Sequence, residues 1–362
     1  MKKYVLFILI IILIANIRIV NAVAPVLKEA MGFGINTPGG IGGQVIKVTN
    51  LNRTGAGSFI NALLTPWPRV IVFEVGGIIN LEGNSYKIID PYLIVAGQTA
   101  PSPGITLVRG GLQIWTHDVV IQHIRIRAGD NDRIKVPWDI DAMTTAYGDA
   151  YNILIDHCSF SWGIDGSLDV SGLRTGPDDT SHWVTLSNNI IAETLNNSIH
   201  SKQSPHSRAT LINDFCQKIA VIRNIYAHND MRQPNFKPAT TGIIVNNLIY
   251  DPGTRCIHTH GSEAEIGGPA DPPKWSIIGN FIKPGPSTTI SALIQSELDV
   301  SIGSAELFIR DNQSSTGNIP LKTGPITEIS AAPVWPQGMV VLPSVQVYGE
   351  LISHSGAPSV GP

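Results

Sequence analysis

Charged residues are scarce in this sequence. They make up 15% of 362 residues, and 25 basic against 28 acidic side chains leave a net charge of −3. This balance provides no basic footprint for nucleic acid, so we expect no nucleic-acid partner. No apolar stripe recurs with a period of 3.6 residues, which argues against leucine-rich and helical repeats.

Cysteine is also rare, and its spacing is uninformative for metal chemistry. Cys158, Cys216 and Cys256 form no CxxC pair, so zinc and thioredoxin-like sites are poorly supported. Two arrangements fit: one disulfide with a leftover thiol, or three buried thiols that behave as small hydrophobic side chains. We favour the second.

Apolar and turn-forming residues, by contrast, are abundant. Hydrophobic residues make up 43% of the chain, enough for a substantial core, and the length allows one large domain or two ordinary ones. The 35 glycines and 25 prolines predict many turns, and runs such as "VIVF", "VVIQ" and "GIIV" predict many short strands.

The first residues have the features of a secretory signal. Lys2 and Lys3 precede an apolar run over 4–15, and Ala22-Val23-Ala24 offers a small-x-small cleavage pattern. The alternative is a membrane anchor, but the run is short and Arg18 interrupts the segment. We therefore predict a signal peptide over 1–24, a secreted protein, extracellular or periplasmic, and no membrane association of the mature form.

A short pattern recurs along the middle of the chain: an apolar residue, any residue, then His or Asn. Successive occurrences are 34, 31, 36, 23 and 33 residues apart. Periods of this length indicate a solenoid in which each unit buries its face on the next. The polar position falls at His123, His157, Asn188, Asn224, Asn247 and Asn280.

The residues around each polar position alternate with a period near two, so each unit contributes strands. We predict an all-β parallel β-helix over 25–285, in which stacked Asn side chains hydrogen-bond along one bend. A β-sandwich with chance Asn in its turns is the alternative. Ser58 stands at the N-cap of a short amphipathic helix that would cap the first coil. Residues 286–362 are expected to form an irregular segment packed on the solenoid.

Several ordered blocks, from about Gly32 to Asn280, resemble one family. They are "GFGINTPGGIGGQVIKVTNLNRTGAGSF", "PRVIVFEVGGIINL", "LIVAGQTAPSPGITL", "VVIQHIRIRAGD" and "IDHCSFSWGIDGSLDV". Together they are similar to the pectate lyases of polysaccharide lyase family 1. The resemblance implies a secreted, right-handed parallel β-helix that uses calcium.

By this resemblance Asp141 of "WDIDAM", with Asp139 as its neighbour, and Asp165 and Asp169 of "DGSLD" would be calcium ligands. Oxygen ligands suit calcium. On a straight strand Asp165 and Asp169 would stand about 13 Å apart, so a bend is needed, and Gly166 permits one. Solvated loop aspartates are the other reading of the spacing alone.

The family's catalytic base is an arginine in an "RxPxxR" segment, which is "RQPNFK" here. The match assigns Arg232 as the base and places Lys237, which lacks the bidentate fork of arginine, where a substrate carboxylate would be held. The family's substrate-binding lysine aligns near Asn196, which is not basic. Lys202 and His200 lie downstream as candidate substrate-binding residues, with a solvated loop as the alternative.

The implied reaction is calcium-assisted β-elimination on de-esterified, 4-linked galacturonan (pectate) by a monomeric enzyme. Because arginine ordinarily has a pKa above ~12, activity is expected to rise above neutral pH and to vanish with a chelator. Three rivals remain open. One is a polysaccharide hydrolase on the same fold. Another is a pectin lyase, which would act on methylated polymer without calcium and is disfavoured by the presence of Asp141, Asp165 and Asp169. The third is a non-catalytic glycan-binding protein, which the departures at Asn196 and Lys237 keep open.

Overall fold

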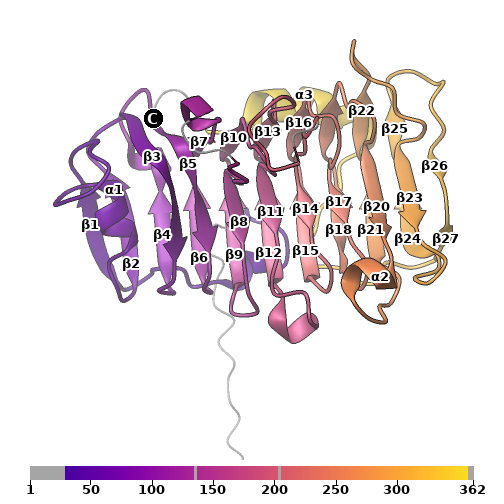
Figure 1. Cartoon of the computed structure of the whole chain (residues 1–362), viewed down its shortest axis with the longest axis horizontal. Helices are drawn as coiled ribbons and strands as arrows, with labels where there is room; N and C mark the ends of the chain where they lie inside the picture. The colour runs from indigo at the N-terminus through magenta and orange to yellow at the C-terminus, as the bar shows by residue number, and fades with distance from the viewer. Residues whose placement is uncertain (1–28, 134–136, 203–204, 358–362) are drawn as a thin grey trace, which may run out of the picture.

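The chain forms a parallel β-helix in which short strands stack coil upon coil along one long axis (Figure 1). The structure is a computed structural model, which describes residues 29–133, 137–202 and 205–357. The predicted signal peptide, 1–24, lies outside these residues. No helix in the described part of the chain is long and apolar enough to cross a bilayer.

The first sheet holds eleven strands within the described residues, and neighbouring strands in it pair in parallel. In order they are β1 (Gln44–Val48), β2 (Arg69–Phe73), β4 (Leu93–Ala96), β6 (Val119–Gln122), β9 (Tyr151–Asp156), β12 (His182–Ser187), β15 (Gln217–Ile222), β18 (Thr241–Val245), β21 (Lys274–Ile278), β24 (Ala305–Arg310) and β27 (Ile326–Glu328).

The second sheet divides into two arms at the long strand β5 (Ile105–Ile114), which also pairs with β3 (Gly77–Ile88). One arm is β7 (Ile124–Arg127), β10 (Ser159–Ser161), β13 (Ile190–Ala192), β16 (Ile225–Ala227), β19 (Leu248–Tyr250), β22 (Phe281–Lys283) and β25 (Gln313–Ser314). The other is β8 (Met143–Thr145), β11 (Leu168–Val170), β14 (Leu211–Ile212), β17 (Asn235–Phe236), β20 (Ile257–Gly261), β23 (Ile294–Leu298) and β26 (Lys322–Thr323). The solenoid therefore has three faces.

Helices are few and short within the described residues. They are α1 (Phe59–Leu63), α2 (Glu263–Ile266), α3 (Ser344–His354) and the 3-10 turns η1 (Gly34–Asn36), η2 (Gly97–Thr99), η3 (Asn131–Arg133) and η4 (Pro177–Asp179). The predicted capping helix is confirmed as α1. Ser58 Oγ accepts a hydrogen bond from Asn61 N at 3.3 Å, and α1 lies at the end of the stack beside β1 and β2 (Figure 1).

The first sheet is apolar on both faces because each face is covered. Its inner side chains, such as Ile153 and Ile155, join the solenoid core. Its outer side chains pack under chain segments from both ends: Ala30 beside Val120 and Leu154, and Met339 beside Ile278 and its neighbours. This double burial explains the continuous apolar runs in these strands, which elsewhere would alternate.

The predicted asparagine stack is present, but its register differs from the prediction at three positions. The buried ladder consists of Asn189, Asn224, Asn247, Asn280 and Asn312, whose amides donate to one another at 2.8–3.0 Å. His123, His157 and Asn188 occupy the preceding position of their coils, where φ is 51–53°. The prediction was wrong there because this left-handed corner also favours Asn and His.

The solenoid continues beyond the predicted boundary at residue 285. Strands β23 to β27 add further coils as far as Glu328, and α3 then packs on β19 and β22 through Val347 and Leu351. The predicted boundary at 285 was therefore too early: coils continue to Glu328, and after it α3 is the one regular element among the described residues. The strands there are short, and several carry few apolar residues, so the repeat pattern fades in the sequence before the coils end.

The predicted state of the cysteines is confirmed: Cys158, Cys216 and Cys256 are free, fully buried thiols in the core. Asp156 also has its predicted structural role. It is buried and accepts hydrogen bonds from His157, Gln122, Ser187 and Asn188. Burial raises the pKa of the Asp156 carboxyl, but the hydrogen bonds from His157, Asn188 and Ser187 outweigh it and lower this pKa.

Candidate active site

One corner of the solenoid carries the predicted site, just before the strands of the β8–β11–β14–β17–β20 arm begin. Strand register places Thr144, Asp169, Leu211, Asn235 and His258 side by side. The residue three positions earlier lies near the same corner in each of these coils, although a parallel bridge pairs Arg208 with Met231 instead of Arg232. These five corner residues are Asp141, Gly166, Arg208, Arg232 and Arg255.

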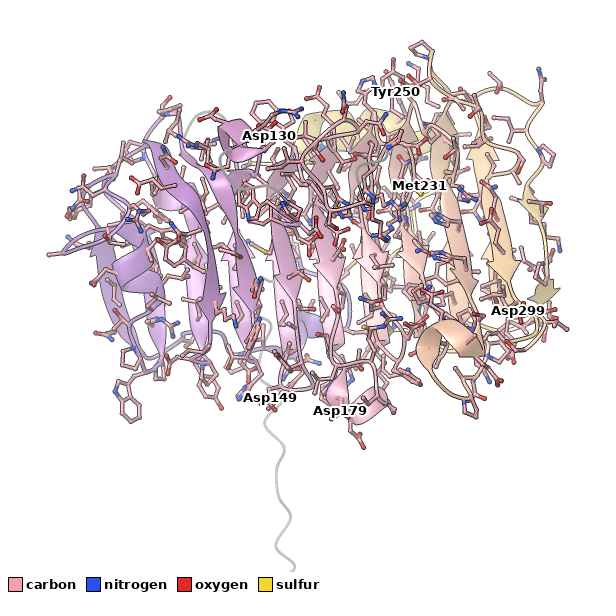
Figure 2. All side chains as sticks on the ribbon, in the orientation of Figure 1. Asp130, Asp149, Asp179, Met231, Tyr250 and Asp299 are labelled. Atoms are coloured by element: carbon pink, nitrogen blue, oxygen red, sulfur yellow. The ribbon has the colours of Figure 1, made fainter. Side chains whose placement is uncertain are left out.

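This corner row is acidic at one end and basic at the other. Adjacent strands lie about 4.8 Å apart, so the three arginines come from coils that follow one another at that interval along the axis. Figure 2 labels Met231, the residue before Arg232, in the C-terminal half of the solenoid, with Asp149 and Asp179 at the opposite end of the strands. The row therefore combines a site for a cation with a track for a polyanion.

Two of the three predicted calcium ligands converge on Gly166. Asp141 Oδ1 accepts the Gly166 N–H at 2.7 Å, and a Cβ on Gly166 would lie only 2.5–2.6 Å from the carboxylate oxygens of Asp169. Asp169 Oδ1 also accepts from Leu211 N at 2.8 Å. Glycine is thus required here by the close approach of a carboxylate.

The three carboxylates repel one another electrostatically. Burial and then the charge of Asp165 raise the pKa of Asp141 to about 7. Burial and then Asp141 raise the pKa of Asp169 well above its usual value. A bound divalent cation would relieve this repulsion, and carboxylate oxygens are the ligands that calcium prefers. The donor set of Asp141, Asp165 and Asp169 therefore fits calcium.

Arg232 lies beside this cluster and is 8% exposed. Its Nε is buried without a hydrogen-bond partner in the described chain. Its φ of 65° is a left-handed conformation that costs a non-glycine residue on the order of 1 kcal/mol. Its charge lowers the pKa of Asp165 and, after the effect of burial, that of Arg208.

A second group of possible ligands surrounds Asp165. One ligand atom each from Asp165, His200 and His206 lies within 4.8 Å of the others. His206 Nε2 is 2.9 Å from Asp165 Oδ1, and His200 Nε2 is 3.5 Å from both Asp165 Oδ1 and Asp139 Oδ1. Nitrogen donors suit transition metals better than calcium, so two chemical roles are open to this group.

The predicted substrate-binding residues are less concentrated. Lys237 is 2% exposed, and its Nζ pairs with Glu265 Oε1 of α2 at 2.7 Å. In this arrangement its ammonium is occupied, so a role in holding a substrate carboxylate stays a prediction. Lys202 is exposed, and its backbone N–H donates to His200 Nδ1 at 3.1 Å. His200 is 3% exposed and faces the carboxylates.

Sequence reasoning did not assign roles to Arg208 and Arg255. Arg208 Nε is buried without a hydrogen-bond partner in the described chain, while Arg255 Nε pairs with Glu297 at 2.8 Å. Their spacing from Arg232, 24 and 23 residues, matches the shortest interval in the repeat and was the available signal. It marks side chains that coincide on successive coils.

Comparison with known proteins identifies relatives of one kind, although no family model matches the chain. It is 34% identical over 269 residues to a probable pectate lyase C of Aspergillus terreus, covering 73% of this chain and 55% of that protein. It is 28% identical over 274 residues to pectate lyase 1 of Cryptomeria japonica, covering 71% of this chain and 67% of that protein. The chain spans about half the length of the Aspergillus relatives it matches.

Solved structures with the same fold include the cedar pollen allergen jun a 1, with a TM-score of 0.64, 18% identity and coverage of 91% of this chain and 92% of that one. A mutant of Bacillus subtilis pectate lyase matches with a TM-score of 0.63 and 15% identity, covering 94% of this chain and 99% of that one. A Bacillus sp. N165 pectate lyase in complex with trigalacturonate matches with a TM-score of 0.58 and 16% identity, covering 91% of this chain and 99% of that one. At these identities the likeness shows the fold. This chain is thus similar in sequence to pectate lyases and shares their parallel β-helix fold.

Proposed function

We propose that the protein is a secreted pectate lyase that cleaves de-esterified, 4-linked galacturonan by β-elimination. Asp141, Asp165 and Asp169 would hold a calcium ion, and Arg232 would act as the base. The bound calcium would supply positive charge to the C6 carboxylate of the sugar and thereby make its C5 proton more acidic. The supporting observation is the position of Arg232 beside three carboxylates at one corner of the solenoid.

In this proposal Arg232 removes the C5 proton, the C4 glycosidic oxygen leaves, and a C4–C5 double bond forms. The departing oxygen takes a proton from water, and Arg232 returns its proton to solvent. A neutral guanidine is needed for the first step, so activity should rise as the pH increases above neutrality.

Substrate recognition is assigned to the basic half of the corner row. Arg208 and Arg255 flank Arg232 on successive coils, so their guanidinium groups can contact carboxylates of successive sugars along an extended chain. The solved pectate lyase complex with trigalacturonate supports this substrate class. Methyl esterification would remove the charge that the arginines recognise, which is why we propose pectate.

The test is ultraviolet absorbance of the unsaturated product during incubation with polygalacturonate at alkaline pH. We expect calcium-dependent growth of the signal in the wild type, none with a chelator and none in Arg232→Ala. Arg310→Ala, which alters an exposed arginine at the end of β24, is the matched control and should retain full activity. Full activity of Arg232→Ala, or an acid optimum with no calcium requirement, would refute the proposal.

A glycan-binding protein without turnover is the second candidate, and the Lys237–Glu265 ion pair favours it because the second basic position of the family motif is occupied. Binding of oligogalacturonate with no absorbance change at any pH would support this function. Secretion is tested separately by locating the protein in culture medium and in cell fractions.

A further inference from the structure

His200 and His206 form a stacked pair beneath Asp165. Their ring centroids are 3.7 Å apart with an interplanar angle of 16°, and the two residues are 3% and 1% exposed. Both Nε2 atoms face the same oxygen, Asp165 Oδ1, at 3.5 and 2.9 Å. Because both rings are buried, we expect neither imidazole to contact a substrate directly, and any role they have would act through Asp165.

The protonation of His200 follows from its other nitrogen. Nδ1 accepts the backbone N–H of Lys202 at 3.1 Å, so Nδ1 carries a lone pair and the proton of the neutral ring is on Nε2. That proton points toward the carboxylates of Asp165 and Asp139. A nitrogen that carries a proton is a donor and cannot ligate a metal ion.

The stacking leads to the same conclusion. A histidine binds metal through a lone pair in the plane of its ring, and two nearly parallel rings direct their lone pairs side by side. An ion midway between rings 3.7 Å apart would lie about 1.8 Å out of each plane. The short distances within this group are therefore better explained by hydrogen bonds to a carboxylate than by an absent transition metal.

The loop that carries His200 is held in place independently. Asp139 Oδ1 accepts the Ser201 N–H at 2.7 Å, and Asp139 Oδ2 accepts the Ser201 hydroxyl at 2.5 Å. On the other side, His206 is followed by Ser207, whose N–H donates to Asn196 Oδ1 at 3.3 Å. Both imidazoles are thus fixed by their own backbone and do not depend on Asp165 for their position.

We infer that His206, assisted by His200, is a positioning residue: His206 donates Nε2–H to Asp165 Oδ1 at 2.9 Å, and His200 Nε2 contacts the same oxygen at 3.5 Å, so that this carboxylate is oriented for the cation that Asp141 and Asp169 would also bind. Within the described residues both contacts fall on Oδ1, which leaves Oδ2 free for the ion. The inference rests on the proposed calcium site, and it excludes a second metal at the histidine pair.

Calcium affinity, measured by isothermal titration calorimetry without substrate, tests this inference. Hydrogen-bond partners of a metal ligand typically contribute 10–100-fold in affinity, so His206→Ala should weaken calcium binding by about that factor. His206→Gln places an amide N–H near the position of Nε2 and should remain within about threefold of the wild type. His354→Ala, which removes an exposed histidine of α3, is the matched control and should change nothing.

Three results would overturn the inference. One is wild-type calcium affinity in His206→Ala. Another is equal loss in His206→Gln and His206→Ala. The third is stoichiometric Co²⁺ binding by the wild type with a nitrogen-ligand absorption spectrum that His206→Ala abolishes. Circular dichroism establishes that each variant is folded. If His206→Ala does not fold, His206→Asn replaces it, because its shorter amide cannot reach Asp165 and the same loss is expected.

The outcome is separable from the proposed lyase activity. Normal calcium binding in His206→Ala with an active wild type rejects the positioning role alone. A wild type that binds calcium through this arrangement yet never cleaves pectate rejects the lyase and leaves the positioning role intact. No calcium binding by the wild type rejects the calcium site and the inference together.

Discussion

Replacing Gly166 by alanine is the smallest change that should disable the proposed calcium site. The added Cβ would lie 2.5 Å from Asp169 Oδ2, 2.6 Å from Oδ1 and 2.7 Å from Cγ. The backbone of Gly166 is not in the left-handed region, so alanine itself brings no conformational penalty. The effect of the substitution is therefore concentrated on one carboxylate.

The size of the displacement follows from contact distances. Carbon and oxygen approach to about 3.3 Å at closest, so the Asp169 carboxylate must retreat by roughly 0.8 Å. Calcium–oxygen distances vary only between about 2.3 and 2.6 Å, a tolerance well below this shift. We expect at least a tenfold loss of calcium affinity, about 1.4 kcal/mol, with parallel loss of lyase activity at low calcium.

Calorimetric titration with calcium measures this loss directly. Gly317→Ala is the control, because a Cβ there meets no atom within 4 Å. High calcium should restore part of the activity of Gly166→Ala if the site is distorted but intact. Unchanged calcium affinity in a folded Gly166→Ala protein would mean that Asp169 does not bind the ion, and the reasoning would be refuted.

Three further predictions concern the polar groups in the rest of the fold. Lys237→Met should lower the free energy of unfolding by about 1–3 kcal/mol and leave KM unchanged, because Lys237 pairs with Glu265. A raised KM at wild-type stability would instead indicate that Lys237 binds the substrate. Asn247→Ala should lower the free energy of unfolding, measured with urea, by about 3–6 kcal/mol, because Asn224 N, Asn224 Nδ2 and the carbonyl of Val221 each lose a hydrogen-bond partner. Asn312→Ala, at the open end of the stack, should lower it by less than half as much. Burial first, and then His157, lower the pKa of His123 to about 4, so the folded protein disfavours the protonated imidazole. The free energy of unfolding should therefore fall by up to about 3 kcal/mol as the pH drops from about 6.5 toward 4. His123→Asn should lose less stability over this range, and equal acid sensitivity of the two proteins would contradict the prediction.

The sequence was sufficient to predict the solenoid, because a coil that cannot bury its face alone repeats its pattern. The sequence was insufficient to predict which residue of each coil joins the asparagine ladder. At Asn188 and Asn189 two adjacent asparagines occur, and the corner residue and the ladder residue accept the same amino acid for different reasons. Asn188 tolerates a φ of 53°, whereas Asn189 hydrogen-bonds inside the core. Only the three-dimensional pairing separates them.

The site was predicted in part. Asp141, Asp165, Asp169 and Arg232 were identified by resemblance, and the structure brings them together at one corner. Arg208 was not assigned a role because strand pairing, which the sequence does not display, is what brings it to the coil beside Arg232. The burial of Lys237 was missed for a similar reason: its partner Glu265 lies 28 residues away on a helix of four residues.

The three buried thiols can be used as labels to follow how the solenoid unfolds. Cys158, Cys216 and Cys256 lie in different coils, and burial raises the pKa of each well above that of a free thiol, so alkylating reagents should not modify the native protein. Pulse labelling in rising denaturant, read out by peptide mass, would then report the coil in which unfolding begins. Simultaneous labelling of the three cysteines would show that the coils unfold as a single cooperative unit. Labelling in a fixed order would show from which end of the solenoid unfolding proceeds.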